Sequence, residues 1–342
     1  MNGTAHSARW TPERARRWIE NRPWLCGCNF VPSTAINSTE MWQADSFDEA
    51  AIERELGWAA DIGFNSVRVF LQYLVWEADP HGLKRRMDRL LSITSGHGIS
   101  VMPVLFDDCC QSGRQPYLGK QDAPIPGVCL SGWTPSPGHA RVVDRSVWPR
   151  LAGYVKDIVG EFGQDERVVI WDLYNEPGGG RPGGALGEDS LPLLTASFEW
   201  ARAAAPSQPL TVGTFGGEPE SLTRALLAES DLISFHAYMN VDRTRKMIVE
   251  LEAHGRPVVC TEWMARTAES RFETHLPLFN DHRVGCYSWG LVAGKTQTYY
   301  PWRSQAGAPE PELWFSDLLR EGGAPYRSEE VQAIRRMAGR RP

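Results

Sequence analysis

Two glutamates follow short apolar runs whose residues favour β-strands. Glu176 comes directly after VVIWDLYN, and Glu262 comes directly after PVVCT. Cleavage of a glycosidic bond requires two carboxyl groups, one that protonates the leaving oxygen and one that is ionised opposite it. The tripeptide Asn-Glu-Pro around Glu176 is weak evidence alone, and Glu262 alone could form an ordinary ion pair. Together they predict acid–base and nucleophilic chemistry, provided that the fold brings the two strand ends together.

The composition is that of a globular protein. Of 342 residues, 42% are hydrophobic and 23% are charged, and the net charge is −6. Such an acidic chain lacks the basic face of a general nucleic-acid binder, so we expect no nucleic-acid partner. No run approaches the roughly 20 apolar residues of a membrane span, and residues 1–21 contain no signal-peptide core. We therefore expect a cytoplasmic protein without membrane contacts.

Short apolar segments alternate with longer amphipathic ones along the chain. The strand candidates are 24–30, 66–71, 100–106, 168–174, 210–214, 232–236, 258–261 and 285–289. Helix candidates separate them at 47–62, 83–96, 147–162, 191–205, 218–229, 243–254 and 271–282. Strands that are apolar throughout must be covered on both faces, which is typical of parallel sheets. The alternation predicts an α/β protein of the (β/α)8 TIM barrel class.

A doubly wound open sheet is the alternative fold, but no G-x-G-x-x-G motif follows the first strand. For the same reason we expect no dinucleotide, and we expect no other cofactor. The chain reads as one catalytic domain over residues 1–342, with residues 1–23 as an N-terminal extension. Long βα loops follow the third, fourth and eighth predicted strands at 107–145, 178–189 and 291–312. In a barrel these loops form the face that carries the active site.

The two glutamates resemble the catalytic pair of a known group of enzymes. Asn175-Glu176 after the fourth strand and Glu262 after the seventh are similar to motifs of the retaining glycoside hydrolases of clan A, which include glycoside hydrolase family 5 with its cellulases, mannanases and xylanases. The resemblance implies that Glu176 is the acid/base and Glu262 the nucleophile. We expect their carboxyl groups to lie roughly 5–5.5 Å apart, as retention requires. We also expect the charge of Glu262 to raise the pKa of Glu176.

Further positions match the same family one by one. Arg68, in NSVRVF, resembles the arginine that orients the nucleophile, and His236 and Tyr238, in SFHAY, resemble its H-x-Y pair. Trp289, in CYSWG, resembles the tryptophan beneath the cleaved sugar, and the GCNFVPS run implies that Asn29 lies near the site. Asn175 is then expected to donate its amide to the 2-hydroxyl of that sugar.

The residues after the third strand depart from the family pattern. The family commonly has a histidine or another sugar-binding polar group there, whereas this chain has Asp107 and Asp108. A carboxylate at this position could bind two sugar hydroxyls, or it could pair with Arg68 or Lys120. Among the 14 tryptophans of the chain, further subsites could be lined by Trp263 and Trp302.

Three cysteines, Cys109, Cys110 and Cys129, fall in the loop after the third strand. They could pair or bind a metal, but no paired C-x-x-C spacing is present, so we favour structural thiols and no metal site. The sequence thus predicts a retaining β-glycoside hydrolase that acts on oligosaccharides or small β-glycosides. Action from the non-reducing end is a hypothesis, and the choice between exo and endo action stays open. A transglycosylase, a non-catalytic carbohydrate-binding barrel and a metal-dependent barrel hydrolase or isomerase are the alternatives. The sugar, the linkage and the oligomeric state stay open.

Overall fold

The computed structural model describes residues 8–110, 113–179 and 186–338. In these residues a single sheet of parallel strands runs in the order β5-β4-β3-β2-β1-β9-β8-β7-β6. The strands are β1 (Cys26–Asn29), β2 (Ser66–Phe70), β3 (Ser100–Asp107), β4 (Trp171–Asn175), β5 (Leu210–Thr211), β6 (Gly213–Thr214), β7 (Ile233–Ala237), β8 (Val258–Trp263) and β9 (Gly285–Trp289).

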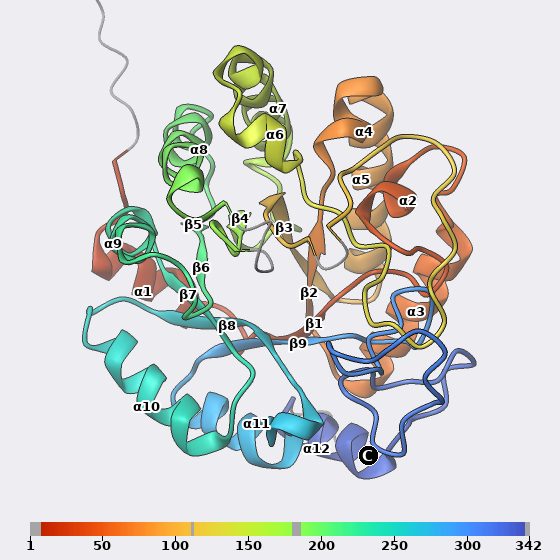
Figure 1. The fold of residues 1–342 in the computed structure, drawn as a ribbon. Coiled ribbons are helices and arrows are strands. Elements are labelled where there is room, and N and C mark those ends of the chain that lie inside the picture. Colours follow the sequence, from red (N-terminus) through yellow and green to blue (C-terminus); the bar gives the residue numbers. More distant parts are fainter. Residues whose placement is uncertain (1–7, 111–112, 180–185, 339–342) are drawn as a thin grey trace, which may run out of the picture.

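The sheet closes into a barrel through one interrupted strand. β5 and β6 are separated only by Val212, and together they occupy the predicted fifth strand. β5 pairs with β4 whereas β6 pairs with β7, so this segment joins the two ends of the sheet. The prediction of an eight-stranded α/β barrel is therefore confirmed, and Figure 1 shows the strands as a ring inside a layer of helices.

The helices that surround the barrel begin and end at residues with a physical reason to do so. They are α1 (Pro12–Glu20), α2 (Ser38–Trp42), α3 (Glu49–Ile62), α4 (Tyr73–Ala78), α5 (Pro80–Gly96), α6 (His139–Val143), α7 (Trp148–Phe162), α8 (Leu191–Ala203), α9 (Glu220–Glu229), α10 (Val241–Glu252), α11 (Phe272–Asp281) and α12 (Ser328–Met337). In α3, the Asp48 side chain accepts a hydrogen bond from the amide of Ala51, and Gly63 ends the helix with φ 108°. Such caps satisfy backbone groups that a helix end leaves open. None of the described helices is long and apolar enough to cross a membrane.

The predicted N-terminal extension is part of the barrel where it is described. Helix α1 lies against the ends at which the strands begin, because Trp18 Nε1 donates to the carbonyl of Val169 over 3.2 Å. Ile19 packs on a small apolar cluster that includes Leu25 and Tyr287. The face opposite the strand carboxyl ends is thus closed by this helix, which leaves the other face for the site.

Two long loops join each other on the carboxyl face of the barrel. The loop after β3 and the loop after β9 are connected by hydrogen bonds from the Leu130 amide to Thr296 O and from the Gly307 amide to Pro126 O, each 2.8 Å long. Gln297 adds a side-chain bond to the carbonyl of Ile125. The two loops, yellow and blue in Figure 1, therefore form one wall beside the barrel mouth. Residues 180–185 of the predicted loop 178–189 lie outside the described residues.

Candidate active site

Glu176 and Glu262 meet at the carboxyl face of the barrel. Glu176 directly follows β4, and its φ of 44° lies in the left-handed region, which costs a non-glycine residue on the order of 1 kcal/mol. Glu262 lies inside β8, one residue before its end. One carboxylate oxygen of each glutamate lies within 4.8 Å of the other. This separation fits the retaining geometry of roughly 5–5.5 Å and not the wider inverting gap.

Both oxygens of the Glu262 carboxylate accept hydrogen bonds. Arg68 Nη1 donates to Oε1 over 2.8 Å, and the Tyr238 hydroxyl donates to Oε2 over 2.8 Å. Only 7% of the Glu262 side chain is exposed. A permanently charged guanidinium and a hydroxyl donate to its two oxygens, and charge-assisted hydrogen bonds of this kind are strong. This carboxylate is therefore fixed in orientation.

Arg68 connects the parts of the site from a position without solvent exposure. Besides Glu262, it donates to the side-chain carbonyls of Asn29 and Asn175 over 2.8 and 2.7 Å, and it forms a salt bridge of 2.8 Å with Asp172. Burial acts to lower the pKa of Arg68, but the carboxylates of Asp172 and Glu262 outweigh burial and raise it. The guanidinium of Arg68, which lies on β2, thus stays charged and holds residues of β1, β4 and β8 in one arrangement.

Glu176 has different partners from those of Glu262. His236 Nδ1 lies 2.7 Å from Oε1, and the Cys109 thiol donates to Oε2 over 2.9 Å. Burial acts to raise the pKa of Glu176, but the hydrogen bond and charge of His236 outweigh burial and lower it. The sequence-based expectation of a raised pKa was wrong, because His236 Nδ1 stands between the carboxylates and lies 3.6 Å from Glu262.

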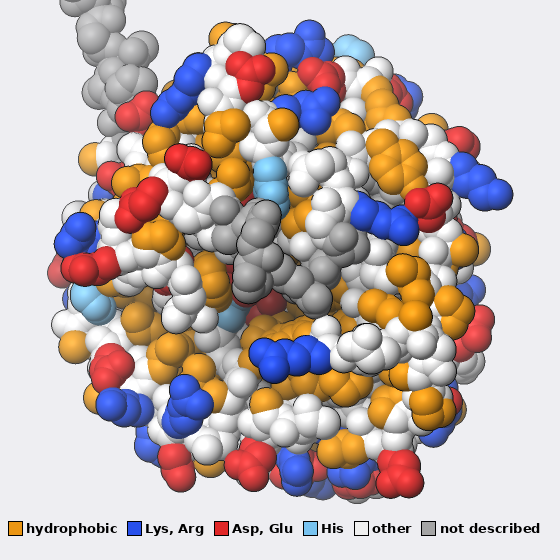
Figure 2. All heavy atoms as spheres, viewed as in Figure 1, with side chains coloured by type: hydrophobic (Ala, Val, Ile, Leu, Met, Phe, Trp, Pro, Cys, Tyr) orange, Lys and Arg blue, Asp and Glu red, His pale blue; other side chains and the backbone are white. Residues whose placement is uncertain are grey.

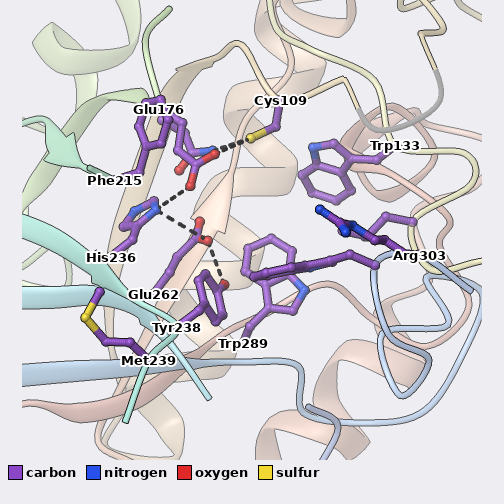
Figure 3. Close-up of a pocket in the computed structure, with 13 residues that line it drawn as sticks. Cys109, Trp133, Glu176, Phe215, His236, Tyr238, Met239, Glu262, Trp289 and Arg303 are labelled. Carbon is purple, nitrogen blue, oxygen red and sulfur yellow. Dashed lines mark hydrogen bonds and ion pairs between the residues drawn. The ribbon is translucent and has the colours of Figure 1, made fainter. Parts of the chain in front are cut away.

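Glu176 and Glu262 line a cavity of about 600 Å³. Figure 3 shows the carboxylates of Glu176 and Glu262 on one side and the rings of Trp133 and Trp289 with Arg303 on the other. The lining residues are Cys109, Leu130, Trp133, Asn175, Glu176, Phe215, His236, Tyr238, Met239, Glu262, Trp289, Trp302 and Arg303. This volume lies within the range of small-molecule pockets, and the aromatic surface suits the apolar face of a sugar ring.

Three tryptophans form the wall opposite Glu176. The Trp289 ring packs edge-on against Trp133, with their centroids 5.9 Å apart, and Trp302 packs edge-on against Tyr238 at 4.8 Å. Trp133 comes from the loop after β3, and Trp302 from the loop after β9. Trp133 was not predicted to be a site residue, because nothing in the sequence shows which residues of a long insertion reach the barrel mouth.

The model of the cellulase family (glycosyl hydrolase family 5) matches residues 33–295 of the chain, which is most of its length. The chain belongs to glycosyl hydrolase family 5. It is therefore an O-glycosyl hydrolase of the retaining β-glycoside type, as the resemblance of its motifs implied. The family match also confirms the expectation of a carbohydrate substrate.

Solved structures of the same fold come from several bacteria. GH5_18 from Streptomyces cattleya, in complex with Manβ1-4GlcNAc, is similar with a TM-score of 0.62 and 15% identity over 94% of this chain and 82% of that chain. The exo-β-1,4-mannosidase Op5Man5 from Opitutaceae bacterium strain TAV5 has a TM-score of 0.60 and 19% identity, over 92% of this chain and 60% of that chain. An endo-β-1,4-mannanase from Thermotoga petrophila has a TM-score of 0.60 and 13% identity, over 94% and 77%. Comparison with curated protein sequences gives no match.

Asp107 and Asp108 do not point into the cavity of this family 5 enzyme. Asp107 accepts hydrogen bonds from Asn175 Nδ2 and Trp133 Nε1, both 2.8 Å long, and Asp108 accepts from the Tyr174 hydroxyl and the Gly178 amide. The side chains of both are buried. The predicted roles of these aspartates, either a contact with sugar hydroxyls or an ion pair with Arg68 or Lys120, were wrong. Neutral donors of the protein occupy their oxygens instead. The two aspartates fix the residues on either side of the cavity.

Two other predicted binding residues lie outside the cavity. Trp263 is fully buried, and its ring stacks on His275 of α11 at 5.6 Å, because successive residues of a strand point to opposite faces and Glu262 already points inward. Asn29 is also buried and uses its amide to donate to Thr261 O. Asn29 therefore holds Arg68 and β8 in place, and Trp263 belongs to the packing between β8 and its helix.

The buried carboxyl group of Asp107 should make the free energy of unfolding depend on pH. Burial raises its pKa to about 7, against the opposing hydrogen bonds from Asn175, Cys109 and Trp133. Its stabilising contribution is therefore complete below the pKa of the unfolded chain and is lost as the pH rises through 7. We expect the free energy of unfolding to fall from pH 4 to 8, and Asp107→Asn to remove on the order of 1–4 kcal/mol of that fall. Urea denaturation at several pH values measures this, and an identical slope in both proteins would contradict it.

Proposed function

We propose that Glu262 is the nucleophile and Glu176 the acid/base of a double-displacement hydrolysis. The observation that carries this assignment is the pair of facing carboxylates with opposite surroundings. Arg68 and Tyr238 donate to Glu262, whereas Glu176 shares a hydrogen bond with His236 and is the more exposed carboxylate, at 20%. A nucleophile must be ionised and oriented, and an acid/base must exchange a proton with the substrate and then with water.

In the first step, an oxygen of Glu262 forms a bond to the anomeric carbon while the glycosidic bond breaks. Glu176 transfers its proton to the departing oxygen, so the leaving group departs neutral. In the second step, Glu176 takes a proton from a water molecule, whose oxygen attacks the anomeric carbon and releases Glu262. The same face of the sugar is attacked in this step as was vacated by the leaving group, so the configuration is retained.

His236 gives Glu176 a partner with which to share its proton. Its Nδ1 contacts Glu176 Oε1, and the carboxylates of Glu262 and Glu176 raise the pKa of His236 although burial opposes them. When substrate fills the cavity, it displaces water from Glu176 and disfavours the ionised form. The proton of the Glu176–His236 pair then moves toward Glu176, where the leaving oxygen needs it.

We further propose that the enzyme removes sugars from the non-reducing end of short β-linked oligosaccharides. The leaving group lies beside the acid/base. The glycone, which is the sugar that becomes attached to Glu262, therefore extends the other way, toward Trp289 and Trp133. On that side, the joined loops after β3 and β9 form a wall that contains Trp133, Trp302 and Arg303. Figure 2 shows the hollow bordered by hydrophobic and basic side chains. A wall at this position favours a short glycone and opposes threading of a long polymer.

A manno-configured sugar is the first to test. The solved structures of the same fold include an exo-β-1,4-mannosidase and an endo-β-1,4-mannanase, and a third was solved with Manβ1-4GlcNAc. The three share only 13–19% identity with this chain, so they guide the choice of substrate without deciding it.

The direction of cleavage can be measured with reducing-end-labelled β-1,4-oligosaccharides of four to six sugars. We expect a monosaccharide to accumulate from the first minutes, together with labelled products shortened one sugar at a time, because the wall blocks longer glycones. Labelled products of random length at early times would contradict exo action. The same chromatograms detect longer products, which would show that transfer to sugars competes with hydrolysis and would favour the transglycosylase alternative.

A metal-dependent reaction is the less favoured alternative. Glu176, His236 and Glu262 could in principle supply ligands to a metal ion. However, the Arg68 guanidinium contacts Glu262 and would repel a cation there, and Tyr238 occupies the other oxygen of Glu262. We also propose a cytoplasmic location, supported by the free thiols of Cys26, Cys28, Cys260 and Cys286 along the barrel strands, since free thiols are typical of a reducing compartment.

A further inference from the structure

The thiol of Cys109 borders the cavity and contacts the carboxylate assigned as the acid/base. We propose that Cys109 is a positioning residue for Glu176, which orients its carboxyl group and sets the pH range in which it can donate a proton. This inference rests on the proposed role of Glu176. From the sequence, Cys109 was expected to be a structural thiol, and the proposed role goes beyond that expectation.

Cys109 lies in a directed chain of hydrogen bonds. Asn175 Nδ2 approaches the sulfur at 3.5 Å, and the sulfur lies 2.9 Å from Glu176 Oε2. A thiol has only one proton, and the amide nitrogen can only donate, so the thiol proton must point to the carboxylate. The amide of Cys109 itself donates to Asp107 over 2.9 Å, which fixes the backbone. The direction of the bond to Glu176 is therefore determined by the neighbours of the sulfur.

The protonation state of Cys109 follows from the charges around it. Burial and the carboxylates of Glu176, Asp107 and Glu262 raise its pKa well above the ordinary range. Arg68 and His236 contact carboxylates instead of the thiol, since Arg68 pairs with Glu262 and His236 with Glu176. Cys109 therefore stays a neutral thiol and acts as a donor, not as a nucleophile.

A thiol is a weak hydrogen-bond donor, which makes it suited to orient the carboxyl group of an acid/base. Both oxygens of Glu176 are held, Oε1 by His236 and Oε2 by Cys109, so the carboxyl plane is fixed for proton transfer. A strong donor at Oε2 would stabilise the ionised form and make Glu176 a poor acid at neutral pH. Because a thiol donates weakly, it orients the group at a smaller cost to its proton affinity.

Cys109→Ala tests this role through the leaving-group dependence of kcat/KM. The variant should lose about tenfold on alkyl or sugar leaving groups, which need the acid, and change little on a 2,4-dinitrophenyl glycoside, which does not. The alkaline limb of the pH profile of kcat/KM should move to higher pH, because a donor to the ionised carboxylate is gone. Cys109→Ser should keep most activity, with that limb moved to lower pH, because a hydroxyl donates more strongly than a thiol to the ionised carboxylate. Equal losses on both substrates, or an unmoved limb, would overturn the proposal.

Cys110→Ala is the matched control, because its thiol donates to Arg114 O and not to the site; it should show neither effect. In a Glu176→Ala background, Cys109→Ala should cause no further loss, since a positioning residue acts only through its partner.

The Glu176→Ala variant alone separates the proposed role of Glu176 from that of Cys109. If it shows the leaving-group split and Cys109→Ala does not, only the role of Cys109 fails. If Glu176→Ala shows no split, the role of Glu176 fails and that of Cys109 with it. Should Cys109→Ala not fold, the pH profile of Cys109→Ser decides by the same criterion.

Discussion

Glu262→Ala is expected to lose activity by a factor on the order of 10⁴–10⁶ and to regain part of it when azide is added. The substitution removes the proposed nucleophile and leaves space beside the anomeric carbon. Azide can enter that space and attack from the same face as the missing carboxylate, so the product should be an α-glycosyl azide. Steady-state kinetics on a 2,4-dinitrophenyl β-glycoside, with the product identified by NMR, measure both effects.

Glu262→Gln is the matched control for this rescue. Glutamine keeps the volume of the side chain and can still contact Tyr238, so azide should find no space and restore little activity. A rescued product of β configuration, or wild-type activity of Glu262→Ala without azide, would show that another group attacks the sugar. Circular dichroism of both variants should show a folded barrel, because a family 5 site of this kind is built on strands that pair without Glu262's side chain.

Arg68→Met is expected to have the second-largest effect and to act on stability as well as on rate. It removes the buried cation that contacts two carboxylates and two asparagines. Removing one partner of a buried pair leaves an uncompensated charge, which costs about 3–5 kcal/mol. Asp172 depends most on Arg68, since it is fully buried and its Oδ1 has no hydrogen-bond partner among the described residues. The free energy of unfolding, measured by chemical denaturation, and kcat should both fall sharply in the variant.

A second substitution separates the two effects of Arg68. In Arg68→Met with Asp172→Asn, the buried charge on β4 is removed, so part of the lost free energy of unfolding should return. The rate should stay low, because Glu262 still lacks the donor at Oε1. If activity returned together with stability, Arg68 would be a structural residue and not a partner of the nucleophile. Arg68→Lys should stay slow as well, because one ammonium cannot reach the four acceptors that the planar guanidinium contacts.

The barrel and its reactive pair were predictable from the sequence because both depend on local patterns. Strands buried on both faces must be short and apolar throughout, and this pattern marked all eight strands, including the one that divides at Val212. The parallel order then places every strand end on the same face. Glu176 and Glu262 therefore had to meet, whatever the sequence between them, and the family match agrees with this reading.

The partners of these glutamates were decided only by the tertiary structure. The alternation of a strand turns Trp263 away from the site, and the convergence of two long loops brings Trp133 and Trp302 to one wall. The direction of the pKa shift of Glu176 depends on the 2.7 Å contact with His236, which no sequence pattern specifies. Likewise, Asp107 binds Asn175 and Trp133 instead of sugar. Sequence determined which groups could react, because composition and periodicity act locally. Only folding determined which groups surround them, because hydrogen bonds and charges depend on distances between residues far apart in the chain.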